Sequence, residues 1–114
     1  MIDAPALPAA SPHIFARLNC SREALEKICK EYDVIELSVF GSVVRDDFDP
    51  KKSDIDFMVV FDPDATLGLI GYEDLRRRLA RKTRRRVDLV SKNWLSADFR
   101  DRVLPEARVV YAAG

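Results

Sequence analysis

The chain contains few of the residues from which proteins build zinc sites and disulfide bridges. Its 114 residues include two cysteines, Cys20 and Cys29, and one histidine, His13. The cysteines form no CxxC pair and have no histidine partner, which argues against a zinc site. Two reduced thiols fit a cytoplasmic protein, and the cytoplasm is the location we expect. His13 follows Pro12 in a proline-containing arm, where we assign it no chemical role.

Long apolar runs and an excess of either charge are also absent. No run approaches the roughly 20 apolar residues that span a bilayer, so we expect no membrane segment. The N-terminus lacks a basic start followed by an apolar stretch, so we expect no signal peptide. The 19 basic and 19 acidic side chains cancel. The net charge therefore gives no general argument for binding to nucleic acid or to a membrane.

What is present suits one globular domain. Hydrophobic residues make up 47% of the chain and charged residues 33%, a balance typical of folded proteins. The length suits a single core, and no internal repeat or second domain is visible. Residues 1–19 contain three prolines and several small residues. We predict a flexible N-terminal arm there, with a short ordered piece at 14–18, and the folded domain at 20–114.

Hydrophobic periodicity and turn residues divide the domain into alternating helices and strands. We predict apolar strands at 34–40, 55–61, 86–90 and 108–111. We predict helices at 21–32, 72–81 and 95–103, a short helix at 43–46, turns at 47–53 and a loop around Pro63 and Gly68. This order indicates an α/β (α+β) fold with a small mixed β-sheet flanked by helices.

A pair of aspartates begins the second predicted strand. Asp54 and Asp56 are two residues apart, and strand side chains at i and i+2 point to the same face. Two carboxylates on one face repel each other, and a divalent cation relieves that repulsion. Mg²⁺ prefers carboxylate oxygens together with phosphate oxygens and water, so the pattern suits a metal–nucleotide site. Two solvated aspartates at a polar strand start are the alternative.

The junction after the first strand has the composition of a phosphate-binding turn. Gly41 lets the backbone approach a ligand closely, and a helix N-terminus offers free N–H groups to phosphate. The hydroxyl of Ser42 adds a donor. Arg45 either reaches a phosphate or pairs with a nearby aspartate and holds the loop, and Ser53 either shapes the metal site or caps the turn. An ordinary strand-to-helix turn is the alternative for the segment.

A third aspartate, Asp88, lies within the apolar strand predicted at 86–90. An aspartate among apolar neighbours needs a partner, because burial of a lone charge is costly. If this strand lies beside the one that contains Asp54 and Asp56, its carboxylate joins the metal cluster. It would then also orient or deprotonate an attacking hydroxyl. The alternative is a strand-edge aspartate that faces water.

Together, Gly41-Ser42, Asp54-Ile55-Asp56 and Asp88 resemble the DNA polymerase β-like nucleotidyltransferase superfamily. The motif of that superfamily is Gly-Ser, a spacer, Asp-x-Asp and a third carboxylate on a later strand. The chain looks more closely like the minimal nucleotidyltransferases of bacteria and archaea. The likeness covers residues 21–112 and depends on the segments 40–45, 53–59, 87–90 and 106–112. One difference is Asp46, which stands where the family usually has glycine.

The resemblance implies roles for the residues of the motif. The implied catalytic residues and Mg²⁺ ligands are Asp54, Asp56 and Asp88. The implied nucleotide-binding residues are Gly41, Ser42, Arg45 and Ser53. ATP would be the substrate, with AMP passing to a hydroxyl and pyrophosphate leaving.

The resemblance also implies a partner. A chain of 114 residues has no room for the acceptor-binding domain of larger relatives, so the acceptor is expected on another molecule. Minimal nucleotidyltransferases are commonly paired with HEPN-domain toxins, and the implied function is an antitoxin that adenylylates a tyrosine of the toxin. Two alternatives stay open: an antitoxin that acts by binding alone, and an enzyme that acts on tRNA or a small molecule.

An arginine-rich segment at 76–86 is the other conspicuous feature. It has eight positive residues in eleven and can be interpreted as a contact surface for RNA or an acidic partner. A solvated helix face and loop is the favoured interpretation, because the chain is neutral as a whole.

Overall fold

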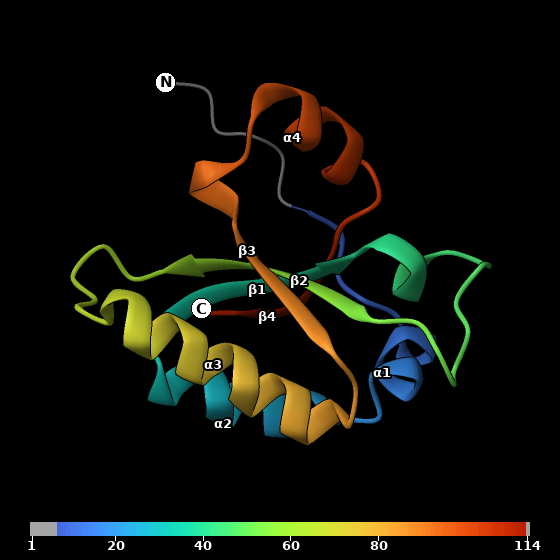
Figure 1. Cartoon of the computed structure of the whole chain (residues 1–114), viewed down its shortest axis with the longest axis horizontal. Coiled ribbons are helices and arrows are strands. Elements are labelled where there is room, and N and C mark those ends of the chain that lie inside the picture. The colour runs from blue at the N-terminus through green and yellow to red at the C-terminus, as the bar shows by residue number, and fades with distance from the viewer. Residues whose placement is uncertain (1–6, 114) are drawn as a thin grey trace.

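The computed structural model describes residues 7–113, which form a four-stranded mixed sheet and four α-helices (Figure 1). The elements occur in the order α1 (Pro12–Leu18), α2 (Arg22–Glu31), β1 (Val34–Phe40), the 3₁₀ turn η1 (Gly41–Val44), β2 (Ile55–Phe61), α3 (Gly68–Thr83), β3 (Val87–Ser91), the 3₁₀ turn η2 (Lys92–Trp94), α4 (Ala97–Val103) and β4 (Arg108–Ala112). The strand order is β3-β2-β1-β4, with β1 antiparallel to both neighbours and β2 parallel to β3. This confirms the predicted fold class. None of the helices within residues 7–113 has the length and apolar character needed to cross a membrane.

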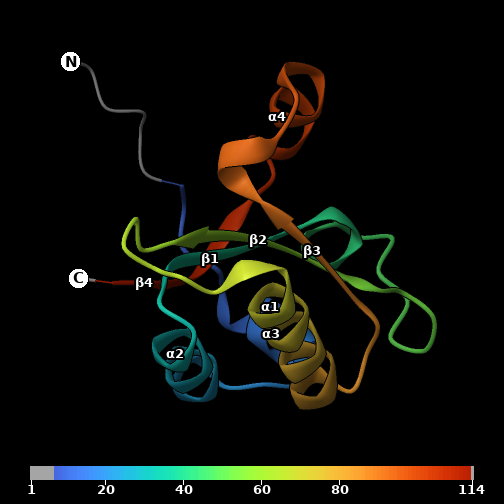
Figure 2. The same ribbon diagram turned by 60° about the vertical axis from the view of Figure 1, so that its left-hand side comes forward.

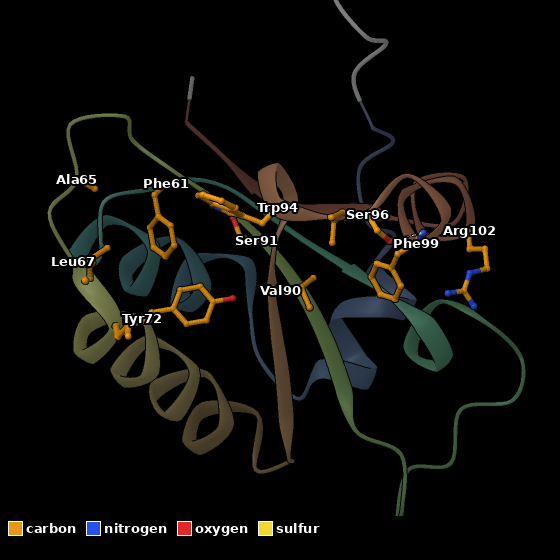
Figure 3. A pocket seen from close by; sticks show the side chains of 13 residues that line it. Phe61, Ala65, Leu67, Tyr72, Val90, Ser91, Trp94, Ser96, Phe99 and Arg102 are labelled. Carbon is orange, nitrogen blue, oxygen red and sulfur yellow. Dashed lines mark hydrogen bonds between the residues drawn. The ribbon is translucent and has the colours of Figure 1, made fainter.

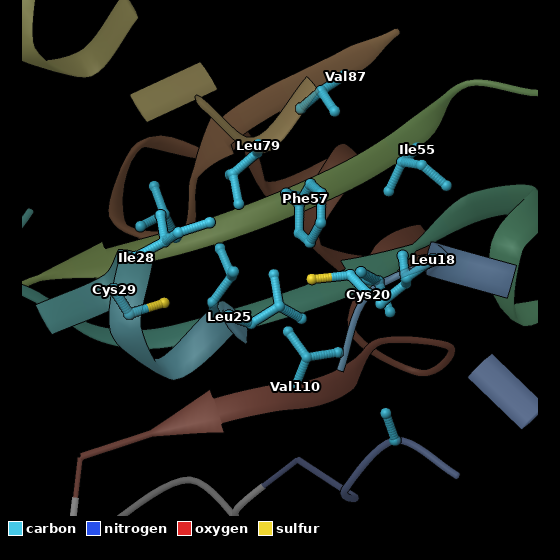
Figure 4. Packing of buried hydrophobic residues seen from close by; sticks show 14 of the residues in the cluster. Leu18, Cys20, Leu25, Ile28, Cys29, Ile55, Phe57, Leu79, Val87 and Val110 are labelled. Atoms are coloured by element: carbon cyan, nitrogen blue, oxygen red, sulfur yellow. The ribbon is translucent and has the colours of Figure 1, made fainter. Parts of the chain in front are cut away.

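The helices divide unequally between the two faces of the sheet. Helices α2 and α3 cover one face with α1 beside them, and α4 stands on the opposite face (Figures 1 and 2). The main core lies under α2 and α3, where Phe57 of β2 is buried in one cluster with Leu25 and Leu79 (Figure 4). This closed face is the part of the molecule that stabilises the fold.

The face that bears α4 is only partly covered. A smaller cluster joins Phe40 and Met58 of the sheet to Val103 at the end of α4 and Ala107 directly before β4. Because strand side chains alternate between faces, Asp56 shares the face of Met58 and not that of Phe57. The candidate carboxylates therefore lie on the more open side of the sheet.

The short ordered piece predicted at 14–18 of the N-terminal arm is a helix that begins two residues earlier than predicted. The first six residues of the arm lie outside the described residues, but Pro12–Leu18 form α1. Ser11 caps this helix by accepting a hydrogen bond from the N–H of Ile14, and Ile14 and Leu18 are buried in the main core. Proline suggested a loose arm, yet Pro12 occupies the first helical turn, where its missing N–H costs nothing.

Helix α3 begins about one turn before the predicted start at residue 72. Gly68 was expected in a loop, and it is the first residue of the helix. The first turn exposes Leu69 and Ile70, each 88% accessible, so the periodic apolar face that predicts a helix is missing there. The other predicted helices and strands agree with the structure to within two residues at each end.

Candidate active site

Two carboxylates lie side by side on neighbouring parallel strands. Asp56 of β2 is in register with Asp88 of β3, and Asp54 directly precedes β2. Burial, and after it the nearby carboxylates of Asp88 and Asp54, raise the pKa of Asp56 from 3.8 to about 6. The strand adjacency on which the metal-site hypothesis depended is therefore present. The metal-binding role itself stays a prediction.

Gly41 lies directly against this pair. Phe40, the last residue of β1, pairs with Asp56 across the sheet, so the η1 turn starts beside the carboxylates. The φ angle of Gly41 is 77°, a left-handed conformation that costs other residues energy. A Cβ atom at position 41 would overlap Oδ2 of Asp56. Both the backbone conformation and the available space therefore require glycine here.

The two serines predicted to bind nucleotide have different surroundings. Ser42 follows Gly41 in η1 and is partly buried. Ser53 Oγ accepts a hydrogen bond from the N–H of Asp49 at 2.8 Å, and the N–H of Ser53 donates to the Asp49 carbonyl at 2.9 Å. Of the two roles considered for Ser53, the turn cap is the contact present in the structure. A nucleotide contact stays a prediction for both serines.

Arg45 is held by two carboxylates. Its guanidinium donates to Asp47 at 3.2 Å and to the two carboxylate oxygens of Glu106 at 3.0 and 3.1 Å. The loop-holding alternative for Arg45 is thus the contact observed. The positive charge also favours the ionised form of Asp56, which places Arg45 within electrostatic reach of the carboxylate pair.

Glu106 is a site residue that sequence reasoning missed. Besides binding Arg45, its Oε2 accepts a hydrogen bond from the N–H of Gly41 at 2.5 Å. Glu106 is 61 positions from Arg45 and 65 from Gly41 along the chain, so no spacing rule connects them. The available signal was its place in the C-terminal segment 106–112 of the family resemblance.

A cavity of about 500 Å³ opens at the carboxylates. Its lining includes Asp56, Asp88 and Arg76, together with the aromatic rings of Phe40 and Phe99. The Phe40 and Phe99 rings contact each other edge to face at 5.9 Å, which closes one side of the cavity. The site therefore combines charged groups with an apolar wall, as small-ligand sites commonly do.

A larger apolar groove of about 1050 Å³ adjoins this cavity, and Val90 and Phe99 line both (Figure 3). Its lining also includes Tyr72 of α3, Phe61 of β2 and Trp94 of η2. Trp94 is 87% exposed. A wide apolar surface therefore begins next to Asp88 and leads away from the carboxylates.

Comparison with known proteins agrees with this geometry. The model of the nucleotidyltransferase domain matches residues 21–111. The chain belongs to the nucleotidyltransferase family. A solved structure of a candidate minimal nucleotidyltransferase is 35% identical in sequence, with a TM-score of 0.62 over 75% of this chain and 85% of that one. The predicted family is therefore confirmed.

More distant structures share the fold of this nucleotidyltransferase at 22% identity. One is a Shewanella oneidensis complex of a tri-AMPylated HEPN toxin with an MNT antitoxin, with a TM-score of 0.60 over 85% of this chain and 72% of that chain. Another is a toxin–antitoxin structure with AMP-PNP, with a TM-score of 0.65 over 81% and 73% of the two chains. No curated protein matches the sequence.

The carboxylates of this nucleotidyltransferase suit Mg²⁺ that is held jointly with a nucleotide. Within residues 7–113, no group of three or more His, Cys, Asp or Glu side chains is arranged to hold a metal ion by itself. Mg²⁺ usually takes one or two carboxylates and completes its shell with phosphate oxygens and water. The partly buried Asp56, with Asp88 beside it, supplies such a donor set.

Several arginines of the 76–86 segment have partners within the chain. Arg76 pairs with Glu73, and Arg78 pairs with Glu31 at 2.8 Å. The guanidinium of Arg85 lies 4.9 Å from the centre of the Phe48 ring. These contacts favour the helix-face interpretation of the segment, and RNA binding stays a hypothesis.

Proposed function

We propose that this nucleotidyltransferase transfers AMP from ATP to a tyrosine of a HEPN-domain toxin and thereby acts as its antitoxin. The observation that supports the proposal most directly is the register pairing of Asp56 with Asp88, next to the glycine turn at Gly41. A protein that only binds its partner has no use for two repelling carboxylates on one sheet face. The AMPylated toxin in a structure with this fold supports the choice of acceptor.

The three aspartates serve metal binding, and Asp88 serves proton transfer as well. Asp54, Asp56 and Asp88 would hold Mg²⁺ jointly with the oxygens of the nucleotide, and the bound ion would supply stabilisation of the negative charge that develops during the transfer. Asp88, exposed on the edge strand β3, orients the acceptor hydroxyl and takes its proton. The hydroxyl oxygen bonds to the α-phosphorus, the bond from that phosphorus to the β-phosphate oxygen breaks, and pyrophosphate leaves. The turn at Gly41 and Ser42 binds the triphosphate.

The acceptor protein approaches over the apolar groove. Val90 and Phe99 join the groove to the carboxylate cavity, and the groove lies beside the edge strand that bears Asp88. A partner bound there would cover Leu69 and Trp94, which are among the most exposed large apolar side chains of the described residues. The same contact would also serve a binding-only antitoxin, so the groove does not distinguish the two functions.

The test is co-expression with the protein encoded by the neighbouring reading frame, which the proposal expects to be a HEPN-domain toxin, followed by intact-mass measurement. We expect the partner to gain the mass of AMP, and to gain none with Asp88→Asn. A partner that is neutralised without modification would replace the enzyme by the binding-only antitoxin. If AMP is found on tRNA or on a small molecule and the partner is unmodified, the result would favour an enzyme that acts on tRNA or a small molecule.

A further inference from the structure

Glu106 contacts both ends of the η1 turn. Its Oε2 accepts from the N–H of Gly41 at 2.5 Å, and Arg45 donates to its Oε1 and Oε2 at 3.0 and 3.1 Å. The N–H of Gly41 and the guanidinium of Arg45 are groups that a triphosphate would also attract. A carboxylate of the protein therefore occupies two anion-binding groups of the turn that is proposed to bind phosphate.

The backbone on both sides of Glu106 is anchored. This indicates that Glu106 is a fixed support of the turn and not a movable group that competes with phosphate. Glu106 lies between α4 and β4, where its N–H and that of Ala107 both donate to the carbonyl of Val103, at 3.1 and 3.0 Å. Val103 is 5% exposed and Ala107 is fully buried, so the residues on both sides are anchored in the smaller core. The backbone cannot swing away from Gly41 without exposing these two side chains.

We propose that Glu106 is a positioning residue for the phosphate-binding turn, an inference that rests on the proposed nucleotide function. By accepting from Gly41, Glu106 fixes the glycine against Oδ2 of Asp56. By pairing with Arg45, Glu106 keeps the guanidinium close to the carboxylate pair and out of the space where the nucleotide would bind. Direct phosphate contact then falls to Ser42 and the later N–H groups of η1, and Glu106 itself touches neither nucleotide nor metal.

Glu36 provides a matched control. It pairs with Lys92 at 2.9 Å and its side chain is 27% exposed, against 26% for Glu106, which pairs with Arg45 at 3.0 Å. Glu36 lies on β1 opposite Val60, at the other end of the strand from Phe40 and Asp56. Glu36→Gln therefore removes a similar ion pair at a distance from the site.

The Glu106 variants separate the two contacts. Glu106→Gln keeps an oxygen that can accept from Gly41 but loses the charge that holds Arg45, whereas Glu106→Ala loses both. We expect the affinity for Mg²⁺-bound ATP, measured by calorimetry, to fall by at least about tenfold in Glu106→Ala and by less in Glu106→Gln. In Glu36→Gln the affinity for Mg²⁺-bound ATP should change by less than about twofold. Thermal unfolding should nevertheless show a loss of stability comparable to that of the Glu106 variants.

A second measurement tests the hydrogen bond between Glu106 and Gly41 in the absence of nucleotide. The amide resonance of Gly41 in the free protein should shift in both Glu106 variants, because its hydrogen-bond acceptor changes, and should stay in place in Glu36→Gln. An unmoved Gly41 resonance, or equal losses of affinity in the Glu106 and Glu36 variants, would overturn the proposal. Tighter ATP binding by Glu106→Ala would also overturn it, and would make Glu106 a competitor of phosphate. If the wild-type chain binds no ATP, the proposed function fails. The Gly41 resonance then shows by itself whether Glu106 holds the turn.

Discussion

The carboxylate of Asp56 lowers the stability of the metal-free protein at neutral pH. Its pKa is raised from 3.8 to about 6 by burial and by the negative charges of Asp88 and Asp54. The native state therefore binds more protons than the unfolded state between about pH 4 and pH 6. The free energy of unfolding falls as the pH rises through this window and stays lower above it. A charge that weakens the fold at neutral pH is one that a bound cation would compensate.

Replacement of Asp56 by asparagine should therefore stabilise the metal-free protein at neutral pH. We expect the free energy of unfolding to rise by about 1–3 kcal/mol at pH 7 and to change little near pH 4, because the unfavourable charge is absent from the variant. Urea denaturation at the two pH values measures the difference. Asp64→Asn, at an exposed position in the loop before α3, is the control and should show no such gain. A gain as large at pH 4 as at pH 7 would point to altered packing and not to charge.

Asp88 separates nucleotide binding from transfer. Asp88→Asn keeps the shape of the side chain and removes the charge, and Asp88 is exposed, so β3 should stay folded. We expect AMP transfer to the partner to fall by about 10²–10⁴-fold, the usual loss for a positioned base, while ATP still binds. Calorimetry and AMP incorporation on the same preparation give the two values. Transfer at the wild-type rate would make Asp88 a structural residue of the strand.

At the scale of secondary-structure elements, local periodicity in the sequence predicts the strands that form the site. Alternating and β-branched apolar residues predict β1 and β2 with the bounds that the structure has. The i, i+2 spacing also predicts one face for Asp54 and Asp56, and the structure places Asp56 in β2 with Asp54 directly before that strand. To place Asp88 beside Asp56, one must also assume that the strands predicted at 55–61 and 86–90 are neighbours. The parallel pairing of β2 with β3 shows that they are.

Contacts between distant segments are the part that the sequence could not provide. The carboxylate of Glu106 reaches Gly41 only because the α4–β4 turn folds onto the end of β1. Likewise, the first turn of α3 exposes Leu69 and Ile70, so no buried face indicates a helix there. In α1 the ordered piece is predicted from residue 14, and its true start carries a signal too, since Ser11 is a favoured capping residue and Pro12 a favoured first residue.

The groove formed by β3, η2, α3 and α4 leads to a prediction for Trp94. Trp94→Ala removes a large aromatic side chain that lines the groove and is 87% exposed, so the fold should tolerate it. We expect the affinity for the HEPN partner to fall by at least about 1 kcal/mol, roughly fivefold, with ATP binding unchanged. Ile70→Ala is the control, because Ile70 is 88% exposed but does not line this groove. Equal effects of the two variants would place the partner elsewhere.

At the scale of the whole molecule, the main hydrophobic core and the candidate catalytic groups lie on opposite faces of one sheet. The face under α2 and α3 is sealed by the main core (Figure 4). Among the described helices, α4 covers the opposite face, where the carboxylates and the glycine turn lie at one end of the strands. The candidate ligand site is therefore built from three strands and a turn that are far apart in sequence. Such a site exists only in the folded chain, so a ligand that binds it must stabilise the fold.

Mg²⁺-bound ATP should accordingly raise the melting temperature of the wild-type protein. A ligand present at about 100 times its Kd stabilises the native state by about 2.7 kcal/mol, which for a domain of this size is a shift of roughly 10 °C. Thermal unfolding followed by circular dichroism, with ATP and Mg²⁺ added separately and together, measures the effect. We expect the full shift only with both, because the carboxylates need the cation before they tolerate a triphosphate beside them. The variant Asp54→Asn/Asp56→Asn should lose the shift. If that variant melts with the same ligand-induced increase as the wild type, the nucleotide binds at a site that does not include these two aspartates.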